Sequence, residues 1–407
     1  MRKLPLNWVM APIGDLVLSC SQRRPADKEE FQYIDIASID RDKKAITNPQ
    51  HLLGKDAPSR ARKQVQTGDV LVSMTRPNLN AVALVPESLD GQIASTGFDV
   101  LRASDLDPRW LYYVVRTQAF IDRMSELVQG ALYPAVRSKD VRTYIVPIAP
   151  LQEQKRIADK LDAVLARVEA CREHLDRVPT ILKKFRQAVL GAATSGKLTE
   201  EWREANEVSP WRRTCLRDVS FLITKGASPK WQGISYVDAA AKGTLFVTSE
   251  NVREMRLDIS QPKYVASSFN KKQRRSILRR GDILTNIVGA SIGRSAIFES
   301  NELANINQAV CLIRLKEDVN RRFVLYCLSA PDTLSYIHAE KVDVARANLS
   351  LEDVGNIPIS IPSLMEQSEI VRRVEALFQY AERLEQRYVI AREQVERLTP
   401  AILAKAF

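Results

Sequence analysis

Two long stretches of the chain carry apolar residues that alternate in steps of four and three positions. This spacing places the apolar side chains on one face of an α-helix and is typical of a coiled-coil seam. Charged and polar residues fill the other positions, which disfavours a helix that is buried all round. The predicted seam consists of Ile157, Leu161, Val164, Val168, Cys171, Leu175, Val178, Leu182, Phe185 and Val189 in the first helix, and of Ile370, Val374, Leu377, Ala381, Leu384, Tyr388, Ala391, Val395, Leu398 and Ile402 in the second.

The two helices are separated by a whole globular segment, so we expect them to pair in antiparallel fashion, each emerging from its own domain. Core helices of a larger bundle are the alternative. Pro179 lies inside the first seam. Proline has no amide hydrogen and clashes with the preceding turn, so we expect it to kink or interrupt the helix.

The sequence in front of each helix is repeated. Gly68-Asp69-Val70-Leu71 returns as Gly281-Asp282-Ile283-Leu284, an offset of 213 residues. Several further matches in the same register favour a duplication over chance similarity of two domains. At this offset Arg109, Tyr113, Asp140, Val141, Leu151, Glu153, Gln154 and Ile157 match Arg322, Tyr326, Asp353, Val354, Leu364, Glu366, Gln367 and Ile370.

Each copy follows the same plan. A β-rich part with the Gly-Asp strand start is followed by an amphipathic helix, predicted at about 108–124 in the first copy and 320–337 in the second. An apolar segment punctuated by proline then leads into the long helix. The sequence therefore predicts an α+β protein with two globular domains related by a pseudo-twofold axis and joined by two antiparallel coiled-coil helices. The expected boundaries are 1–149 and 201–362 for the domains, and 150–200 and 363–407 for the helices.

The net charge indicates the kind of partner. Sixty Lys and Arg residues against 49 Asp and Glu give +11, which favours nucleic acid or an anionic membrane surface. No apolar run reaches the ~18 residues of a membrane span, and the N-terminus lacks the apolar stretch of a signal peptide. The five cysteines are odd in number and lack Cys-x-x-Cys spacing, which fits a reduced cytoplasmic protein with mostly buried thiols. Nucleic acid is the favoured partner.

Two basic clusters occupy equivalent places before the Gly-Asp strands. Lysine and arginine at such places can contact phosphates without reading sequence. A solvated basic turn is the alternative. The clusters are Lys55, Arg60, Arg62 and Lys63 in the first copy, and Lys271, Lys272, Arg274, Arg275, Arg279 and Arg280 in the second.

Other polar residues are candidates for reading bases, which needs side chains with paired donors and acceptors. They follow the Gly-Asp strands, precede the exit segments or flank the turn at 226–229, although such residues also cap turns. The candidates are Arg76, Asn78, Asn80, Tyr133 and Arg137 in the first copy, and Lys225, Lys230, Asn286, Ser291, Arg294, Arg346 and Asn348 in the second.

No pattern supports catalysis. Residues 191–198 nearly spell a phosphate-binding loop, but Leu198 stands where Ser or Thr must bind magnesium, and the segment follows a helix. We interpret it as the C-terminus of a helix. Loose carboxylate–lysine patterns near Asp42 and Glu153 resemble nuclease motifs but are expected by chance in a chain this charged. The three histidines are scattered, and we predict no catalytic, metal or cofactor site.

The duplicated plan and the helix starts carry a family resemblance. Pro150-Leu151-Gln152-Glu153-Gln154 and Pro362-Ser363-Leu364-Met365-Glu366-Gln367 open the two helices, which end in the similar segments 188–193 and 401–407. The whole chain resembles the specificity subunit of type I restriction–modification systems. It departs from full symmetry because the second helix stops at Phe407 while the first copy continues; either the native protein ends there or a tail is missing.

The resemblance implies a non-catalytic DNA-recognition subunit. Each globular domain would be a target-recognition domain that reads one half of a split DNA target, and the helices would fix the gap between the halves. Two methyltransferase (modification) subunits and restriction (translocase–nuclease) subunits would be partners. S-adenosylmethionine, ATP and Mg would belong to those partners only.

Two other classes of function stay open at this point. The chain is alternatively the specificity part of a single-chain restriction–methylation enzyme whose catalytic part has been removed. A coiled-coil scaffold that binds other proteins is the third class. Methylation with and without an added modification subunit separates the first two, and specific DNA binding separates both from the scaffold.

Overall fold

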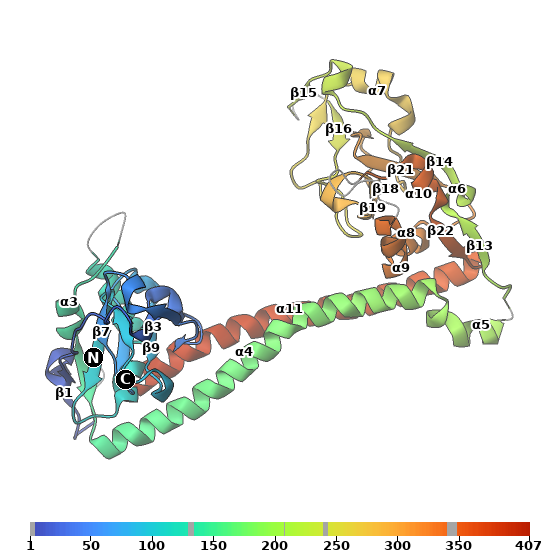
Figure 1. Cartoon of the computed structure of the whole chain (residues 1–407). Coiled ribbons are helices and arrows are strands. Elements are labelled where there is room, and N and C mark those ends of the chain that lie inside the picture. Colours follow the sequence, from blue (N-terminus) through green and yellow to red (C-terminus); the bar gives the residue numbers. More distant parts are fainter. Residues whose placement is uncertain (1–4, 129–133, 207, 239–242, 340–347) are drawn as a thin grey trace. The chain divides into compact units, whose positions relative to one another are not determined.

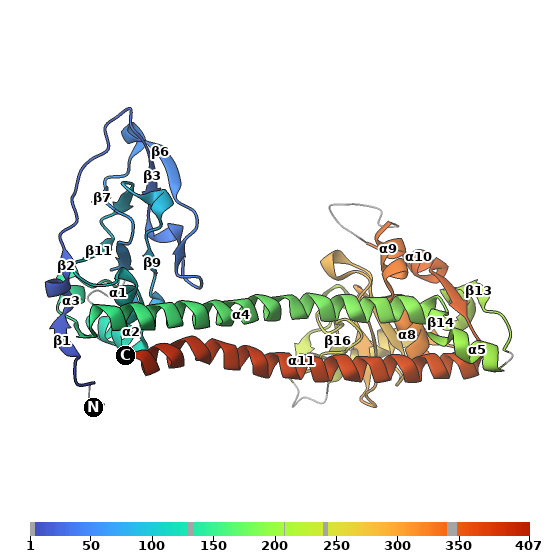
Figure 2. The same cartoon turned by 90° about the horizontal axis from the view of Figure 1, so that it is seen from below.

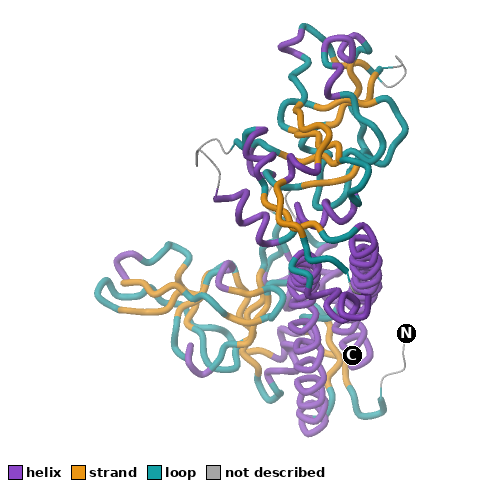
Figure 3. Tube along the Cα trace, turned by 90° about the vertical axis from the view of Figure 1, so that its right-hand side faces the viewer, coloured by secondary structure: helices purple, strands orange, loops and turns teal. Residues whose placement is uncertain are grey.

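The computed structural model describes residues 5–128, 134–206, 208–238, 243–339 and 348–407. It divides into two compact units (Figure 1). Unit 1 comprises residues 1–177 and 388–407, and unit 2 comprises residues 178–387. Each unit therefore contains one globular part together with a section of both long helices. Figure 3 shows the strands of each unit gathered in its globular part.

Unit 1 is built on two four-stranded sheets. The first contains β2 (Val17–Leu18), β11 (Phe98–Ala103), β8 (Val70–Ser73) and β9 (Val82–Leu84), in spatial order. The second contains β6 (Gln50–Leu53), β3 (Glu30–Ile34), β10 (Ile93–Ser95) and β7 (Ala61–Gln64). Two antiparallel ribbons complete the unit: β1 (Val9–Pro12) with β12 (Ile145–Ile148), and β4 (Ile39–Asp40) with β5 (Ala45–Ile46).

Unit 2 repeats this plan. Its first sheet contains β14 (Ser220–Lys225), β21 (Val310–Leu315), β18 (Ile283–Asn286) and β19 (Ser295–Ile297). Its second sheet contains β15 (Tyr236–Val237), β17 (Tyr264–Val265), β16 (Thr244–Val247) and β20 (Ala304–Ile306). The ribbon of β13 (Arg212–Cys215) and β22 (Pro358–Ile361) matches that of β1 and β12.

Three short helices are also duplicated. In unit 1 they are α1 (Pro108–Val114), α2 (Gln118–Glu126) and α3 (Ser138–Arg142), and their counterparts in unit 2 are α8 (Arg321–Ser329), α9 (Pro331–Ala339) and α10 (Leu351–Asn356). Unit 2 also contains α6 (Leu216–Val219) and α7 (Ser268–Lys272). The long helices are α4 (Leu151–Thr194) and α11 (Leu364–Ala406), and α5 (Glu200–Asn206) follows α4.

The single amphipathic helix predicted in each copy is wrong, because each is a pair of short helices. In unit 1 the Thr117 hydroxyl accepts the Phe120 amide at 3.3 Å and caps the start of α2. In unit 2 Pro331 starts α9 directly after the end of α8. A side-chain cap and a proline favour helix starts, and each begins a new helix inside a continuous apolar pattern.

The repeated Gly-Asp pair has the same structural role in both units, at the start of β8 and of β18. Gly68 and Gly281 adopt positive φ values of 82° and 94°, which glycine tolerates without steric cost. The following aspartate is buried and forms two hydrogen bonds with an arginine of the neighbouring strand: Asp69 with Arg102 at 2.9 and 2.8 Å, and Asp282 with Arg314 at 2.8 and 2.7 Å. The pair therefore fixes the strand start in the two first sheets.

The second sheets differ between the units. Both contain one parallel pair, β10 with β3 and β16 with β20. In unit 1 the strand β7 is added beside β10, whereas in unit 2 the strand β15 is added beside β17. The two units thus share a framework but carry different outer surfaces.

Each long helix is joined to its domain by the glutamine of the repeated helix start. The Gln154 side chain accepts the Asp107 amide at 3.0 Å and donates to the Ala149 carbonyl at 2.7 Å. Gln367 makes the equivalent contacts with the Asn320 amide at 2.8 Å and the Pro362 carbonyl at 2.9 Å. These bonds satisfy backbone groups at the start of α1 and α8, where helix amides lack internal partners.

The two long helices lie antiparallel within each unit (Figure 2). In unit 1 Leu161 and Leu403 share a buried cluster, and Arg392 forms an ion pair with Asp176. In unit 2 the apolar residues of both helices join the domain core, and Arg186 pairs with Glu385 at 2.9 Å. Of the twenty predicted seam residues, Cys171 and Leu398 are exposed, and the other eighteen are buried or half-buried. The eighteen include Ile157, Leu161, Val164, Val168, Leu175, Leu182, Ile370, Val374, Leu377, Leu384, Tyr388 and Val395.

Other features of the helices correct or refine the sequence analysis. The helix α4 continues through Pro179, so the expected interruption does not occur. The phosphate-loop-like segment is the end of α4 followed by Gly196, whose φ is 81°. Only Cys311 and Cys327 of the five free thiols are buried, fewer than expected. Within the described residues, no helix combines the length and the apolar character of a membrane span.

Candidate nucleic-acid interface

Two loops that are far apart in the sequence meet at equivalent places in both units. In unit 1 the loop after β8 lies against the segment before α3. The Arg76 amide donates to the Pro134 carbonyl at 2.8 Å, and Thr75 forms an isolated β-bridge with Ala135. In unit 2 the loop after β18 lies against the segment before α10, because Val288 forms an isolated β-bridge with Asn348. The sequence predicted readout residues in these loops, and the structure brings each pair of loops together.

Several predicted readout residues present exposed side chains at these loops. Arg76, Asn78 and Arg137 are exposed in unit 1, and Asn348 is exposed in unit 2. Arg76 has a positive φ of 50°, a conformation that is rare for residues other than glycine and is often found at functional loops. Tyr133 and Arg346 lie outside the described residues.

Two of the predicted base readers are wrong because their side chains are inside the fold. Asn80 is buried and donates to the Val115 carbonyl at 2.8 Å. Asn286 is fully buried, and its amide nitrogen donates to the Ser249 carbonyl at 3.0 Å. Both side chains tie a loop to a neighbouring segment, and neither can reach a base edge.

The remaining residues after β18 are partly used by the fold. The Ser291 hydroxyl accepts the Asn286 side-chain amide at 3.1 Å, and Ser291 is half-buried. Arg294 is also half-buried. Its backbone carbonyl accepts the Asn286 amide, and its backbone amide donates to the Ser291 carbonyl. These two residues shape the loop.

The first basic cluster divides into surface and interior residues. Lys55 and Arg60 are exposed, and the Arg62 guanidinium donates to the Ser59 carbonyl at 3.0 Å. Lys63 points inward: its ammonium donates to the Phe98 carbonyl at 2.6 Å and lies 3.9 Å from Asp99. Burial lowers the pKa of Lys63. The predicted phosphate contact of Lys63 is therefore wrong.

The second basic cluster is a surface feature. Lys271, Arg274 and Arg275 are exposed on α7 and the turn that follows it, and Arg279 and Arg280 are exposed before β18. Lys272 is exposed too, but its ammonium donates to the Gln232 carbonyl at 2.7 Å. This bond ties α7 to the turn that contains Lys230, so two regions predicted separately to contact DNA lie together. Lys225, at the end of β14, is exposed as well.

Trp231 was not predicted as a DNA-contacting residue. It stands between Lys230 and Gln232, whose carbonyl accepts the Lys272 ammonium. Its side chain is 81% exposed although a buried aromatic cluster, with Phe246 and Phe269, lies in the same part of the unit. The short helix Lys230–Gln232 fixes its backbone, because the Gln232 and Ile234 amides both donate to the Pro229 carbonyl. A tryptophan inside a run of basic and turn residues was the available signal. An exposed indole beside lysines can make apolar contacts with nucleic acid, such as those with thymine methyl groups.

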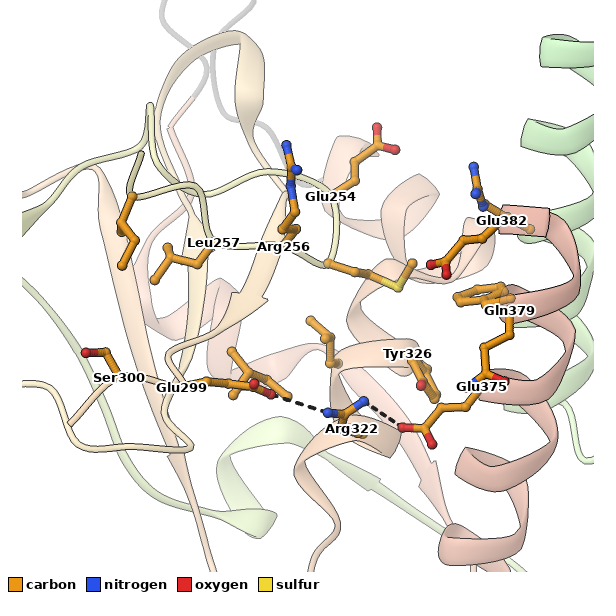
Figure 4. Close-up of a pocket in the computed structure, with 16 residues that line it drawn as sticks. Glu254, Arg256, Leu257, Glu299, Ser300, Arg322, Tyr326, Glu375, Gln379 and Glu382 are labelled. Atoms are coloured by element: carbon orange, nitrogen blue, oxygen red, sulfur yellow. Dashed lines mark hydrogen bonds and ion pairs between the residues drawn. The ribbon is translucent and has the colours of Figure 1, made fainter. Parts of the chain in front are cut away.

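A cavity in unit 2 has a different character. It measures about 1000 Å³ and lies between the globular part and α11. Figure 4 shows Arg322 of α8 at its base, bridging Glu375 of α11 at 2.6 Å and Glu299 at 3.4 Å. Glu254 and Glu382 also line it, so carboxylates outnumber guanidiniums and phosphate binding is disfavoured. The two ion pairs of Arg322 link the globular part of unit 2 to α11.

Equivalent ion pairs link the globular part of unit 1 to α4. Arg109 of α1 donates to Asp159 at 2.7 Å and to Asp162 at 2.6 Å, both on α4. Its ion pairs and hydrogen bonds, first of all that with Asp107, raise the pKa of Arg109. In the described part of the chain, no group of three or more His, Cys, Asp or Glu residues is arranged to hold a metal ion.

These observations define two loop-bearing domains on one helical framework, and comparison with known proteins gives the family. The family described as type I restriction modification DNA specificity domain matches residues 5–178 and 210–390. The chain belongs to this family. The two matches correspond to the two copies of the repeat, each with the first part of its long helix.

Named relatives agree. The specificity subunit of the type I restriction enzyme EcoBI from Escherichia coli is 34% identical over 280 residues, which cover 66% of this chain and 59% of that subunit. The specificity subunit of EcoKI from Escherichia coli K12 is 27% identical over 422 residues, which cover 100% of this chain and 89% of that subunit.

Solved structures extend the likeness to the whole fold. A chain from a study of complex assembly and conformational transition of the type I R-M system is 28% identical, with a TM-score of 0.78, and covers 100% of this chain and 99% of its own. The HsdS subunit from Thermoanaerobacter tengcongensis is also 28% identical, with a TM-score of 0.68. This match covers 100% of this chain and 97% of that subunit.

Proposed function

We propose that the protein is the DNA sequence-specificity subunit of a type I restriction–modification complex and has no catalytic role of its own. The observation that carries this proposal is the pair of equivalent loop sites, one on each copy of a common framework. Each unit reads one half of a bipartite target through these loops and through the basic surfaces beside them. The different second sheets support two unlike half-sites.

The partners in this proposal follow from the family and the repeat. Two modification subunits suit a chain with two equivalent helix–domain frameworks, and restriction (translocase–nuclease) subunits complete the complex. S-adenosylmethionine, ATP and Mg belong to those partners. The long helices fix the distance between the half-sites, since α4 and α11 are each more than forty residues long.

Reconstitution tests this proposal. The chain is combined with the modification subunit of its system, and methylated positions in genomic DNA are mapped by sequencing. We expect methylation only when both are present, at one bipartite sequence. Methylation by the chain alone would indicate the single-chain enzyme. Failure to bind any DNA sequence specifically, with or without the modification subunit, would favour the scaffold.

Trp231 supplies a more local prediction. Replacing Trp231 by Ala removes an apolar contact with the half-site read by unit 2, such as one with a thymine methyl group in the major groove. Partial burial of such a side chain is worth ~1–2 kcal/mol, so we expect DNA affinity to fall about 5- to 30-fold, measured by fluorescence anisotropy with the methylated target as probe. Phe221→Ala is the matched control, because Phe221 is also an exposed aromatic residue of unit 2 (74%) but lies on β14. Equal affinities of Trp231→Ala and the unaltered protein would remove Trp231 from the interface.

A further inference from the structure

The loops that follow β8 and β18 have the same backbone but different side chains. The loop from Arg76 to Asn80 in unit 1 and the loop from Gly289 to Gly293 in unit 2 are equivalent at the offset of 213 residues. In each loop the fourth amide donates to the first carbonyl, at 2.9 Å in unit 1 and at 3.3 Å in unit 2. In each loop φ is positive at the first and last residues, with values of 50° and 44° in unit 1 and of 80° and 86° in unit 2. The side chains of the two loops can therefore be compared position by position.

The first and last residues of the unit 1 loop differ in what their side chains do for the fold. A residue with a β-carbon is strained at positive φ, whereas glycine is not. Asn80 compensates for this strain, because its buried side chain donates to the Val115 carbonyl at 2.8 Å. The Arg76 guanidinium is exposed and, among the described residues, takes part in no hydrogen bond or ion pair. The fold therefore uses the side chain of Asn80 but not that of Arg76.

Unit 2 shows that the framework needs no side chain at the first position of this loop. Gly289 stands there, and a β-carbon added to it would meet no other atom within 4 Å. The space beside the first residue is therefore open, and glycine at this position satisfies the backbone without strain. Arginine at the same position strains the loop and gains no contact within the fold. Backbone strain of this kind is characteristic of sites that bind a ligand.

The backbone around Arg76 is held on both sides. The Arg76 amide donates to the Pro134 carbonyl at 2.8 Å, and the Val136 amide donates to the Met74 carbonyl at 2.9 Å. The direction in which the Arg76 side chain leaves the loop is therefore fixed, which lowers the entropy lost when it binds in one orientation. Such orientation matters for a base edge. A guanidinium presents paired donors in a planar fork, which match the O6 and N7 acceptors of guanine in the major groove.

We propose that Arg76 reads a guanine in the half-site of unit 1, and that unit 2 has no side chain for this contact because Gly289 stands in the equivalent place. The inference rests on the proposed function and adds a specificity-determining residue to it. The half-site of unit 1 then contains a G·C pair opposite the start of this loop. The two half-sites differ at this place even though the two loops have the same backbone.

The test replaces Arg76 by the residue of the other unit. The Arg76→Gly variant is expressed with the modification subunit, and methylated sites are mapped by sequencing. We expect one G·C pair of one half-site to become degenerate, while the other half-site and the gap stay unchanged. In anisotropy measurements with duplexes that differ only at this pair, the preference for guanine should fall about 5- to 150-fold. The melting temperature should not fall, because glycine relieves the strain.

The matched control is Asp105→Gly. Asp105 is also an exposed residue of unit 1 with a positive φ, of 58°, but it lies between β11 and α1. This variant gives the same backbone relief at another place, so the methylated target and the preference for guanine should stay as they are in the unaltered protein.

Three results for Arg76→Gly would overturn the proposal. An unchanged target would remove Arg76 from base reading. Equal loss of affinity for all duplexes, with a salt slope smaller by about 0.9, would identify a phosphate contact. A lower melting temperature would show that the fold uses the side chain. If the unaltered protein and the modification subunit methylated no bipartite target, the proposed function itself would fail, and this inference would fall with it.

Discussion

Reversing Lys271, Arg274 and Arg275 to glutamate is expected to weaken binding to all DNA sequences by about 100-fold at ~0.15 M salt. Each phosphate contact releases counterions and contributes about 0.9 to the slope of log affinity against log salt, so losing three contacts flattens the slope by about 2.7. Specific and non-specific sequences should lose affinity alike, because phosphate contacts carry no sequence information. Lys272 is left in place because its ammonium holds the turn at Gln232.

The measurement is a salt titration of DNA affinity for the target and for an unrelated duplex. The control reverses Lys183, Lys184 and Arg212, which are exposed residues of unit 2 on α4 and β13. It changes the net charge equally and should alter the slope far less. If both triple variants lowered affinity and slope equally, the effect would be one of overall charge, and the cluster would be an ordinary solvated turn.

The long-range organisation of this protein was accessible from sequence because it is periodic. Heptad spacing and an offset of 213 residues are regularities that need no knowledge of tertiary contacts, and they predicted the two helices and the two α+β domains. The helix starts were predicted to within a residue, Leu151 and Leu364, because prolines and the Glu-Gln pair mark them. The break between α1 and α2 was missed, because the apolar pattern continues through Thr117.

The site was predictable only at the level of loops. Asn80 and Asn286 have the side chains that read bases, but the same donors and acceptors equally satisfy buried carbonyls. Which of the two they do depends on contacts with segments about 35 residues away. Lys63 turned inward for a similar reason, since its ammonium bonds Phe98 across the fold. Trp231 was missed although it stands among basic and turn residues, because the exposure of an indole is a tertiary property that such neighbours indicate but do not determine.

The same framework explains why the recognition domains should be exchangeable. At the junction with α4 the Gln154 side chain bonds backbone atoms, of Asp107 and Ala149, so it tolerates different side chains in an incoming domain. The incoming domain must retain a tryptophan at position 8 and an arginine at position 109, whose partners are on α4. Domains of other family members that keep these two residues meet the requirement.

The most direct test of the central claim is therefore a domain exchange followed by mapping of methylated sites. Residues 1–149 are replaced by the corresponding domain of a relative with a different target, and the hybrid is expressed with the modification subunit of this system. The account predicts that one half of the target changes completely to that of the donor, while the other half and the gap stay as they were. A hybrid that methylates DNA with both halves altered, or with neither altered, would contradict the assignment of one half-site to each unit.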